Sequence, residues 1–346
     1  MAAFDEPAWE KLIARAAASG ASDIHLAPGA PAFFRVCGNM TEAGAGPTAG
    51  EISSLVEGWT TAAQRERLRT QGELDFAREE PDTRLRVHAF AARGGLALSI
   101  RLVPREIPPL ESLGVAPVFQ KLLSLRSGLV LVSGKTGAGK TTTLAAFLAA
   151  ISRERAAHIV TLEDPIEYVY ASGKSLISQR ELGVHFASFG RAIRSALRED
   201  PDILLVGELR DADAARAAIG AAETGQLVLA SLHTRSAVEA TRRLESFFPA
   251  AQQQEIRAEL AAVLEAMVSQ ELLPGLRGGR ALASEVLVAT DAVRHLIRVG
   301  KPEQLASCIV SGASVGMQAM RQDIERLAAQ KKIDSALARR RLEEAR

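Results

Sequence analysis

The chain has 346 residues, of which 47% are apolar and 24% are charged; this length allows two or three domains, and the composition excludes a wholly disordered chain. A formal net charge of +1 and an aromatic content of 4% argue against a nucleic-acid-binding function, which favours clustered cations and base-stacking side chains. The sequence has no apolar run long enough to span a bilayer and no apolar stretch typical of a signal peptide, so we expect a cytoplasmic protein with at most peripheral membrane contact.

The first part of the chain predicts a compact α+β domain over residues 1–102. Its apolar residues first follow a helical period and later alternate, as in a small antiparallel sheet. The predicted helices are 8–19 and 51–70, the predicted strands lie within 22–26, 32–36 and 74–102, and 40–51 is predicted to be a loop.

A proline-marked linker is predicted over residues 103–112, and an α/β domain over 113–346. Four nearly continuous apolar runs alternate with helical segments, which indicates a parallel sheet covered on both faces. From residue 252 onward the pattern predicts mostly helix, and 322–346 is charged on most faces, so its end is expected to fray. The predicted strands are 128–133, 157–162, 203–206 and 226–231.

A glycine-rich segment after the first of these strands fits the phosphate-binding pattern GxxxxGK[ST]. Glycines let backbone N–H groups converge on phosphate oxygens, and the helix that follows directs its positive end toward the same anion. A chance glycine-rich turn is the alternative, but a strand before the loop and a helix after it favour an ATP site. The expected nucleotide-binding residues are Gly134, Lys135, Thr136, Gly137, Ala138, Gly139, Lys140, Thr141 and Thr142.

Two carboxylates are expected to act on the bound nucleotide. Glu163 follows the second predicted strand, which we expect to lie beside the phosphate loop, where an acid can polarise an attacking water. Glu208 ends the third strand, and Gly207 stands where an aspartate is usual, so Glu208 alone must serve the metal and its water shell. Thr141 and Glu208 are therefore the predicted Mg²⁺ residues, with surface carboxylates that merely close a strand as the alternative.

His233 ends the fourth predicted strand. A histidine at the carboxyl edge of a parallel sheet, beside a phosphate loop, is a candidate sensor of the γ-phosphate. A hydrogen-bonded structural histidine is the alternative.

Several segments, in this order and spacing, resemble the secretion ATPase superfamily of type II secretion and type IV pili. They are the phosphate loop, the acidic segment TLEDPIE, the segment LREDPDILLVGELRD and the histidine segment AAETGQLVLASLHT. The N-terminal SDIHLAPGAP and the C-terminal AVRHLIR and GMQ are most similar to PilT-type pilus retraction (twitching motility) ATPases, and the resemblance covers about residues 8–335.

This resemblance implies a RecA-like P-loop ATPase domain joined to a smaller, PAS-like N-terminal domain, assembled as a homohexamer. It implies ATP and Mg²⁺ as cofactors and an inner-membrane pilus platform protein as partner, with pilus retraction as the function. It also implies that Arg86 and Arg101 neutralise phosphate charge, with strand-surface cations as the alternative. Arg191, Arg194 and Arg198 have helical spacing and are left open between a subunit contact and a solvated face.

Some positions depart from the family pattern and leave the direction of the motor open. Lys135 stands where proline is common, and Gln226 replaces the first of two histidines. Near the C-terminus, the departures are Ser284 for histidine, His295 for asparagine and Val299 for glutamate.

The alternative functions are an accessory, pilus assembly or type II or IV secretion ATPase, a nucleotide-gated scaffold, and a DNA-translocating RecA-type motor. The only cysteines are Cys37 and Cys308, so the four-cysteine zinc element usual in assembly and type II secretion members is absent, and both thiols are expected to be reduced and buried.

Overall fold

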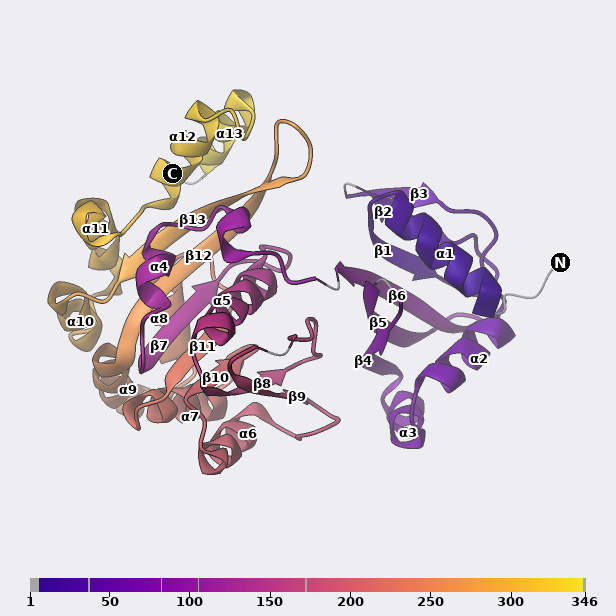
Figure 1. Cartoon of the computed structure of the whole chain (residues 1–346), viewed down its shortest axis with the longest axis horizontal. Helices are drawn as coiled ribbons and strands as arrows, with labels where there is room; N and C mark the ends of the chain where they lie inside the picture. The colour runs from indigo at the N-terminus through magenta and orange to yellow at the C-terminus, as the bar shows by residue number, and fades with distance from the viewer. Residues whose placement is uncertain (1–5, 37, 82, 105, 172, 345–346) are drawn as a thin grey trace. The chain divides into compact units, whose positions relative to one another are not determined.

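The computed structural model describes residues 6–36, 38–81, 83–104, 106–171 and 173–344. The chain divides into two compact units (Figure 1). The first contains residues 1–106 together with the short segment Pro165–Val169, and the second contains 107–164 and 170–346. Cys37 lies outside the described residues, so only Cys308 of the two predicted thiols is placed; it is free and half-buried.

The first unit is an antiparallel sheet in the order β3-β2-β1-β6-β5-β4 with three helices. The amphipathic first helix is confirmed: Trp9, Leu12, Ile13 and Ala16 are all buried in the core of this unit. The elements are α1 (Glu6–Ala18), β1 (Ala21–Leu26), β2 (Phe33–Val36), β3 (Asn39–Glu42), α2 (Ala49–Trp59), α3 (Ala62–Gln71), β4 (Glu73–Glu79), β5 (Thr83–Ala92) and β6 (Gly95–Pro104).

Two predictions for this unit are wrong in detail. The single helix over 51–70 is two helices, because Thr61 begins a new one: its side chain accepts from the Gln64 N–H while the Gln64 side chain accepts from the Thr61 N–H. The predicted loop 40–51 contains most of β3, an edge strand whose four residues are all exposed. A fully exposed strand buries no apolar face, so it leaves no alternation in the sequence.

The second unit is a seven-stranded sheet in the order β13-β12-β7-β11-β10-β8-β9. All neighbours are parallel except β12 and β13, which are antiparallel. The strands are β7 (Gly128–Ser133), β8 (His158–Glu163), β9 (Leu176–Glu181), β10 (Ile203–Val206), β11 (Leu227–Leu232), β12 (Leu264–Pro274) and β13 (Arg280–Val288).

Helices cover both faces of this sheet, as predicted. Alternate residues of the central strands belong to two apolar clusters: Leu129 and Leu131 to one, Val130 and Val132 to the other. The second cluster includes side chains of α4 and α5, and the first includes side chains of α6 to α11. The helices are α4 (Val118–Leu122), α5 (Lys140–Glu154), α6 (Phe189–Ala196), α7 (Ala212–Glu223), α8 (Ala237–Ser246), α9 (Ala250–Val263), α10 (Asp291–Arg298), α11 (Leu305–Ser311), α12 (Met320–Ala329) and α13 (Ser335–Glu344).

The prediction of a mostly helical region after residue 252 holds for the helices α9 to α13, but it misses the strands β12 and β13, which lie within that region. The helix α9 passes directly into β12 at Leu264, with no glycine or proline between them. The composition of β12 (Leu, Glu, Ala, Met) favours a helix, but the strand pairs with β7 on one side and β13 on the other. Tertiary context therefore overrides local propensity.

The C-terminal helices are better packed than their charge predicts. Ile324, Leu327 and Ala338 pack with Leu273 of β12 and Ala283 of β13 in a small apolar cluster.

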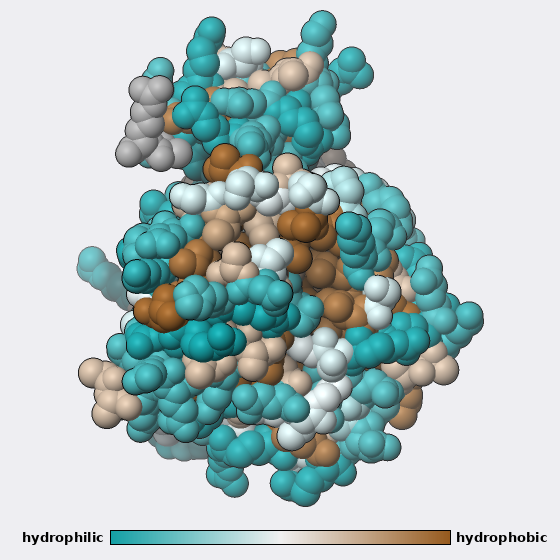
Figure 2. Space-filling view, turned by 90° about the vertical axis from the view of Figure 1, so that its left-hand side faces the viewer, coloured by the Kyte–Doolittle hydropathy of each residue, from teal (hydrophilic) through white to brown (hydrophobic). Residues whose placement is uncertain are grey.

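Figure 2 views the molecule from the side of α10 and α11 and shows hydrophobic groups interspersed among hydrophilic ones. Among the helices that the structure describes, none is long and apolar enough to cross a membrane.

Candidate functional site

The phosphate-binding pattern forms a loop between the carboxyl end of β7 and the start of α5. Gly134 has a φ of 154°, and a Cβ there would lie 2.6 Å from the Gln270 carbonyl oxygen and 2.8 Å from the Ala138 Cβ. Gly139, with a φ of 86°, is the N-cap of α5. The close approach at Gly134 requires glycine and the positive φ at Gly139 favours it, and the result is a cradle of backbone at a helix N-terminus, which suits a phosphate group.

Lys140 begins α5 and is 8% exposed. Its ammonium group donates to the Gly134 carbonyl oxygen at 2.8 Å and to the Lys135 carbonyl oxygen at 3.2 Å. Its Nζ also lies 3.3 Å from Nδ1 of His233. The lysine is thus held within the loop, where a phosphate can replace the carbonyl contacts. The outer part of the loop, residues 135–137, is exposed. Thr141 is also exposed, and Thr142 is half-buried.

Glu163 is the last residue of β8 and is 6% exposed. Its Oε1 accepts from the Thr161 hydroxyl at 2.7 Å and from Nε2 of Gln179 at 3.1 Å. Both donors hold this one oxygen and so fix the orientation of the carboxylate. The expectation that its strand adjoins the phosphate-loop strand is wrong: β11 and β10 lie between β7 and β8.

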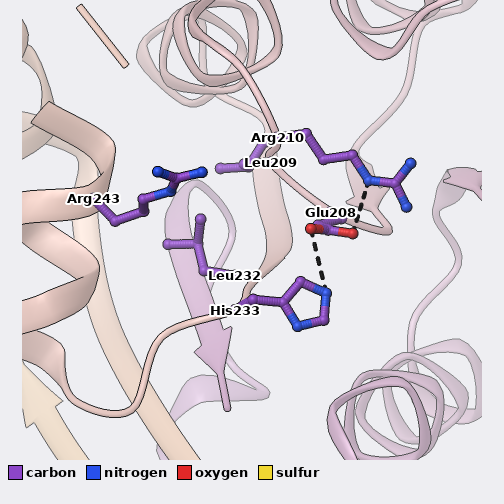
Figure 3. A pocket seen from close by; sticks show the side chains of 6 residues that line it. All are labelled: Glu208, Leu209, Arg210, Leu232, His233 and Arg243. Atoms are coloured by element: carbon purple, nitrogen blue, oxygen red, sulfur yellow. Dashed lines mark hydrogen bonds and ion pairs between the residues drawn. The ribbon is translucent and has the colours of Figure 1, made fainter. Parts of the chain in front are cut away.

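Glu208 lies just after β10, and Figure 3 shows it between His233 and Arg210. Its Oε1 is 3.3 Å from Nε2 of His233, and its Oε2 accepts from Nε of Arg210 at 2.8 Å. Because the Lys140 ammonium can only donate, Nδ1 of His233 accepts, and the ring carries its proton on Nε2 toward Glu208. The structure therefore connects Lys140, His233 and Glu208, three residues that the sequence predicted separately.

A cavity of about 330 Å³ lies beside Glu208 and His233. It is also lined by Arg210 and by Arg243 of α8 (Figure 3). Burial acts to lower the pKa of the Arg210 guanidinium, but the hydrogen bonds and charges of Glu208 and Asp164 outweigh it and raise that pKa.

Arg86 and Arg101 belong to the first unit, where they face each other across β5 and β6. Nη1 of Arg86 is 3.1 Å from Oε1 of Glu167, and Nε of Arg101 donates to Oδ1 of Asp23 at 3.0 Å. The two arginines thus form a pair on one face of the sheet, each with a carboxylate partner.

The sequence left the role of three arginines open, and all three are exposed: Arg191, Arg194 and Arg198. Arg194 makes two contacts with the Asp213 carboxylate, at 2.7 and 2.9 Å, and Arg198 lies in a short 3₁₀ turn beyond the end of α6. Of these three arginines, Arg194 therefore pairs with a residue of α7 within the same chain.

Gln226, one of the departures, precedes β11 at the amino end of the strand, whereas His233 follows the carboxyl end. Six strand residues separate them, about 20 Å. The substitution is thus far from the phosphate loop.

The sequence reasoning missed Arg210, Asp164 and Gln179. Asp164 follows Glu163 in the chain, and Arg210 lies between Glu208 and Asp211, so a cation flanked by acidic residues was an available signal. Gln179 is on an edge strand and had no signal, because only the sheet order brings it to Glu163.

A Mg²⁺ ion would need hard oxygen ligands beside the phosphate loop. Within the ranges that the structure describes, no group of three or more His, Cys, Asp or Glu side chains forms a metal site. The Thr141 hydroxyl and Glu208 carboxylate offer the hard oxygen ligands that Mg²⁺ prefers, and Mg²⁺ typically takes few protein ligands and completes its shell with water and phosphate. These residues fit the ion.

Comparison with known proteins supports a nucleotide site. The family described as "Type II/IV secretion system protein" matches residues 2–277. The chain is 40% identical over 331 residues to the type IV pilus retraction ATPase PilT of Pseudomonas aeruginosa, covering 95% of this chain and 96% of that protein. It is also 45% identical over 317 residues to the uncharacterized protein YggR of Escherichia coli, covering 91% and 97%.

A crystal structure of the pilus retraction motor PilT with bound ADP superposes with a TM-score of 0.84 at 38% identity, covering 95% of each chain. The chain belongs to the type II/IV secretion system protein family and, within it, to the PilT-type ATPases.

Proposed function

We propose that this chain is an ATP-hydrolysing motor that drives type IV pilus retraction. The observation that carries the proposal is the contact between the phosphate-loop lysine, His233 and Glu208, in a chain whose similarity to a pilus retraction ATPase spans 95% of its length. A nucleotide-gated scaffold would need no such acidic residue beside the loop.

In the proposed site, the loop amides and Lys140 bind the β- and γ-phosphates of ATP. Lys140 exchanges its carbonyl partners in the loop for phosphate oxygens, and its contact with His233 changes as it does so. His233, which contacts both Lys140 and Glu208, thereby links the presence of the γ-phosphate to the Glu208 carboxylate. The Thr141 hydroxyl and the Glu208 carboxylate, with water, would hold Mg²⁺, which would neutralise phosphate charge when bound.

Glu163 is proposed to orient and deprotonate the attacking water. The Thr161 and Gln179 contacts hold one of its oxygens and so limit the rotation of the carboxylate. Limited rotation favours general-base catalysis because the base is already oriented.

The assembly is proposed to be a homohexamer that works on an inner-membrane pilus platform protein from the cytoplasmic side. In this proposal, residues 1–102 form a PAS-like domain, 103–112 a linker and 113–346 a RecA-like ATPase domain. Arg86 and Arg101 exchange their carboxylate partners for phosphate during the cycle and lower the barrier to phosphoryl transfer.

The test combines cells and purified protein. Cells that lack the gene, and cells that carry only Lys140→Ala, should both have excess pili that do not retract. Purified Lys140→Ala should lose ATP turnover, whereas Glu208→Gln should lose turnover but still bind ATP. Bald cells would instead indicate an assembly motor, and unchanged piliation an accessory motor or another secretion machine. Equal turnover in the wild type and Lys140→Ala would refute the enzyme assignment.

A further inference from the structure

Arg210 stands on a loop that is held on both sides by the sheet. The Gly207 N–H donates to the Leu162 carbonyl oxygen at 2.7 Å, on the side of β8. The Leu209 N–H donates to the Ser231 carbonyl oxygen at 3.0 Å, on the side of β11. Leu209 is 2% exposed and anchors the loop between them. The backbone that carries Arg210 is therefore fixed.

The guanidinium of Arg210 joins the ends of two neighbouring strands. Its Nε donates to Oε2 of Glu208 at 2.8 Å, and its Nη1 donates to Oδ2 of Asp164 at 2.8 Å. The strands that end here, β10 and β8, are parallel neighbours. A planar fork of donors can hold two carboxylates in fixed directions, which a lysine ammonium cannot do as well.

Three carboxylates lie at these strand ends, those of Glu163, Asp164 and Glu208. Like charges repel, so without a cation the flexible Glu208 side chain would turn toward solvent. The Glu208 and Asp164 side chains are 20% and 24% exposed, which limits screening by water.

We propose that Arg210 is a positioning residue of the ATPase site, which ties Glu208 to Asp164 and thereby holds the other Glu208 oxygen toward His233. The contacts then run without a break from Asp164 through Arg210, Glu208 and His233 to Lys140. Arg210 thus acts through Glu208 and not on the nucleotide itself. This inference rests on the proposed ATPase function and adds a residue to it.

An exposed ion pair with no role is the competing explanation, because the Arg210 side chain is 46% exposed. Such pairs contribute little to stability, so removing this one would change neither the stability nor the activity of the protein. The two explanations differ in what happens to Glu208.

The experiment compares Arg210→Gln, Arg210→Lys and Asp164→Asn with the wild type. The control is Arg321→Gln, which removes an exposed Arg–Glu pair on α12 (3.1 Å, Arg321 58% exposed). The kcat and KM for ATP are measured, together with the Kd of a fluorescent ADP analogue in EDTA and in Mg²⁺. The ADP affinities report on the site without requiring turnover.

Arg210→Gln should lower kcat by about 10- to 100-fold with little change in KM, as for residues that orient a metal shell. Its ADP affinity in EDTA should match the wild type, but Mg²⁺ should tighten ADP binding less than it does in the wild type. Arg210→Lys should restore part of both losses, and Asp164→Asn should show the same pattern more weakly. Arg321→Gln should behave as the wild type.

Wild-type kcat and Mg²⁺ dependence in Arg210→Gln would overturn the inference while leaving the ATPase function intact. Weaker ADP binding in EDTA, in proportion to the loss of kcat, would also overturn it, since Arg210 would then support the fold of the loop. If the wild type has no turnover, the proposed function fails, and the Mg²⁺ effect on ADP affinity still decides the role of Arg210. If Arg210→Gln does not fold, Arg210→Lys and Asp164→Asn decide it.

Discussion

Three glycines of the second unit should respond differently to the same change to alanine. At Gly134, alanine would adopt a φ of 154° and place its Cβ 2.6 Å from the Gln270 carbonyl oxygen. Backbone strain of about 1–3 kcal/mol and overpacking of about 1–3 kcal/mol together predict a loss of about 2–6 kcal/mol in the free energy of unfolding.

The other two glycines are matched controls. Gly137 has a φ of 79° but nothing within 4 Å of the added Cβ, so Gly137→Ala should lose only the strain of a left-handed backbone, about 1–2 kcal/mol. Gly220 lies inside α7 with an ordinary φ and open space, so Gly220→Ala should gain about 0.5–1 kcal/mol.

The assay is urea denaturation without nucleotide, followed by far-UV circular dichroism and by tryptophan fluorescence. Both tryptophans, Trp9 and Trp59, belong to the first unit, so the shifts should appear in the dichroism transition of the second unit and not in the fluorescence. Equal losses for Gly134→Ala and Gly137→Ala would refute the close approach of Gly134 to β12. A loss for Gly220→Ala would refute the reasoning about backbone conformation.

Three further predictions concern substitutions of two glutamates, Glu163 and Glu285, and of one arginine, Arg101. Glu163→Gln should lower kcat by about 10²- to 10⁴-fold and leave the Kd of ATP near the wild-type value; wild-type kcat would exclude Glu163 as the base. Burial raises the pKa of Glu285, against the hydrogen bond it accepts from Ala237, so the native state retains this proton more strongly than the unfolded state. The wild type should therefore lose stability as pH rises through the carboxyl range, and Glu285→Gln should unfold at higher urea than the wild type at pH 7 but not below about pH 4. An advantage that is the same at both pH values would contradict this cause. Arg101→Gln should lower kcat by about 10³-fold or more, yet cost the first unit less than about 1 kcal/mol, because its pair with Asp23 is partly exposed. An unchanged kcat would leave Arg101 as a strand-surface cation.

Predictions from sequence failed where local composition and tertiary context disagree. The strand β12 is made of residues that favour helices, and only its place between β7 and β13 makes it extended. The exposed edge strand β3 left no apolar pattern at all. By contrast, the break between α2 and α3 was readable in principle, since a threonine three residues before a glutamine is a local capping signal.

The sequence alone determined the phosphate loop and the alternation of apolar strands and helices around it. Both are contiguous signals: a glycine pattern imposes its backbone within eight residues, and a buried parallel strand is apolar along its whole length. Only the tertiary structure decided that Lys140, His233, Glu208, Arg210 and Asp164 form one chain of contacts. They come from four segments of the chain, and their order in space follows from the strand order of the sheet. That order depends on how the strands pack their two apolar faces, which no single segment of sequence encodes.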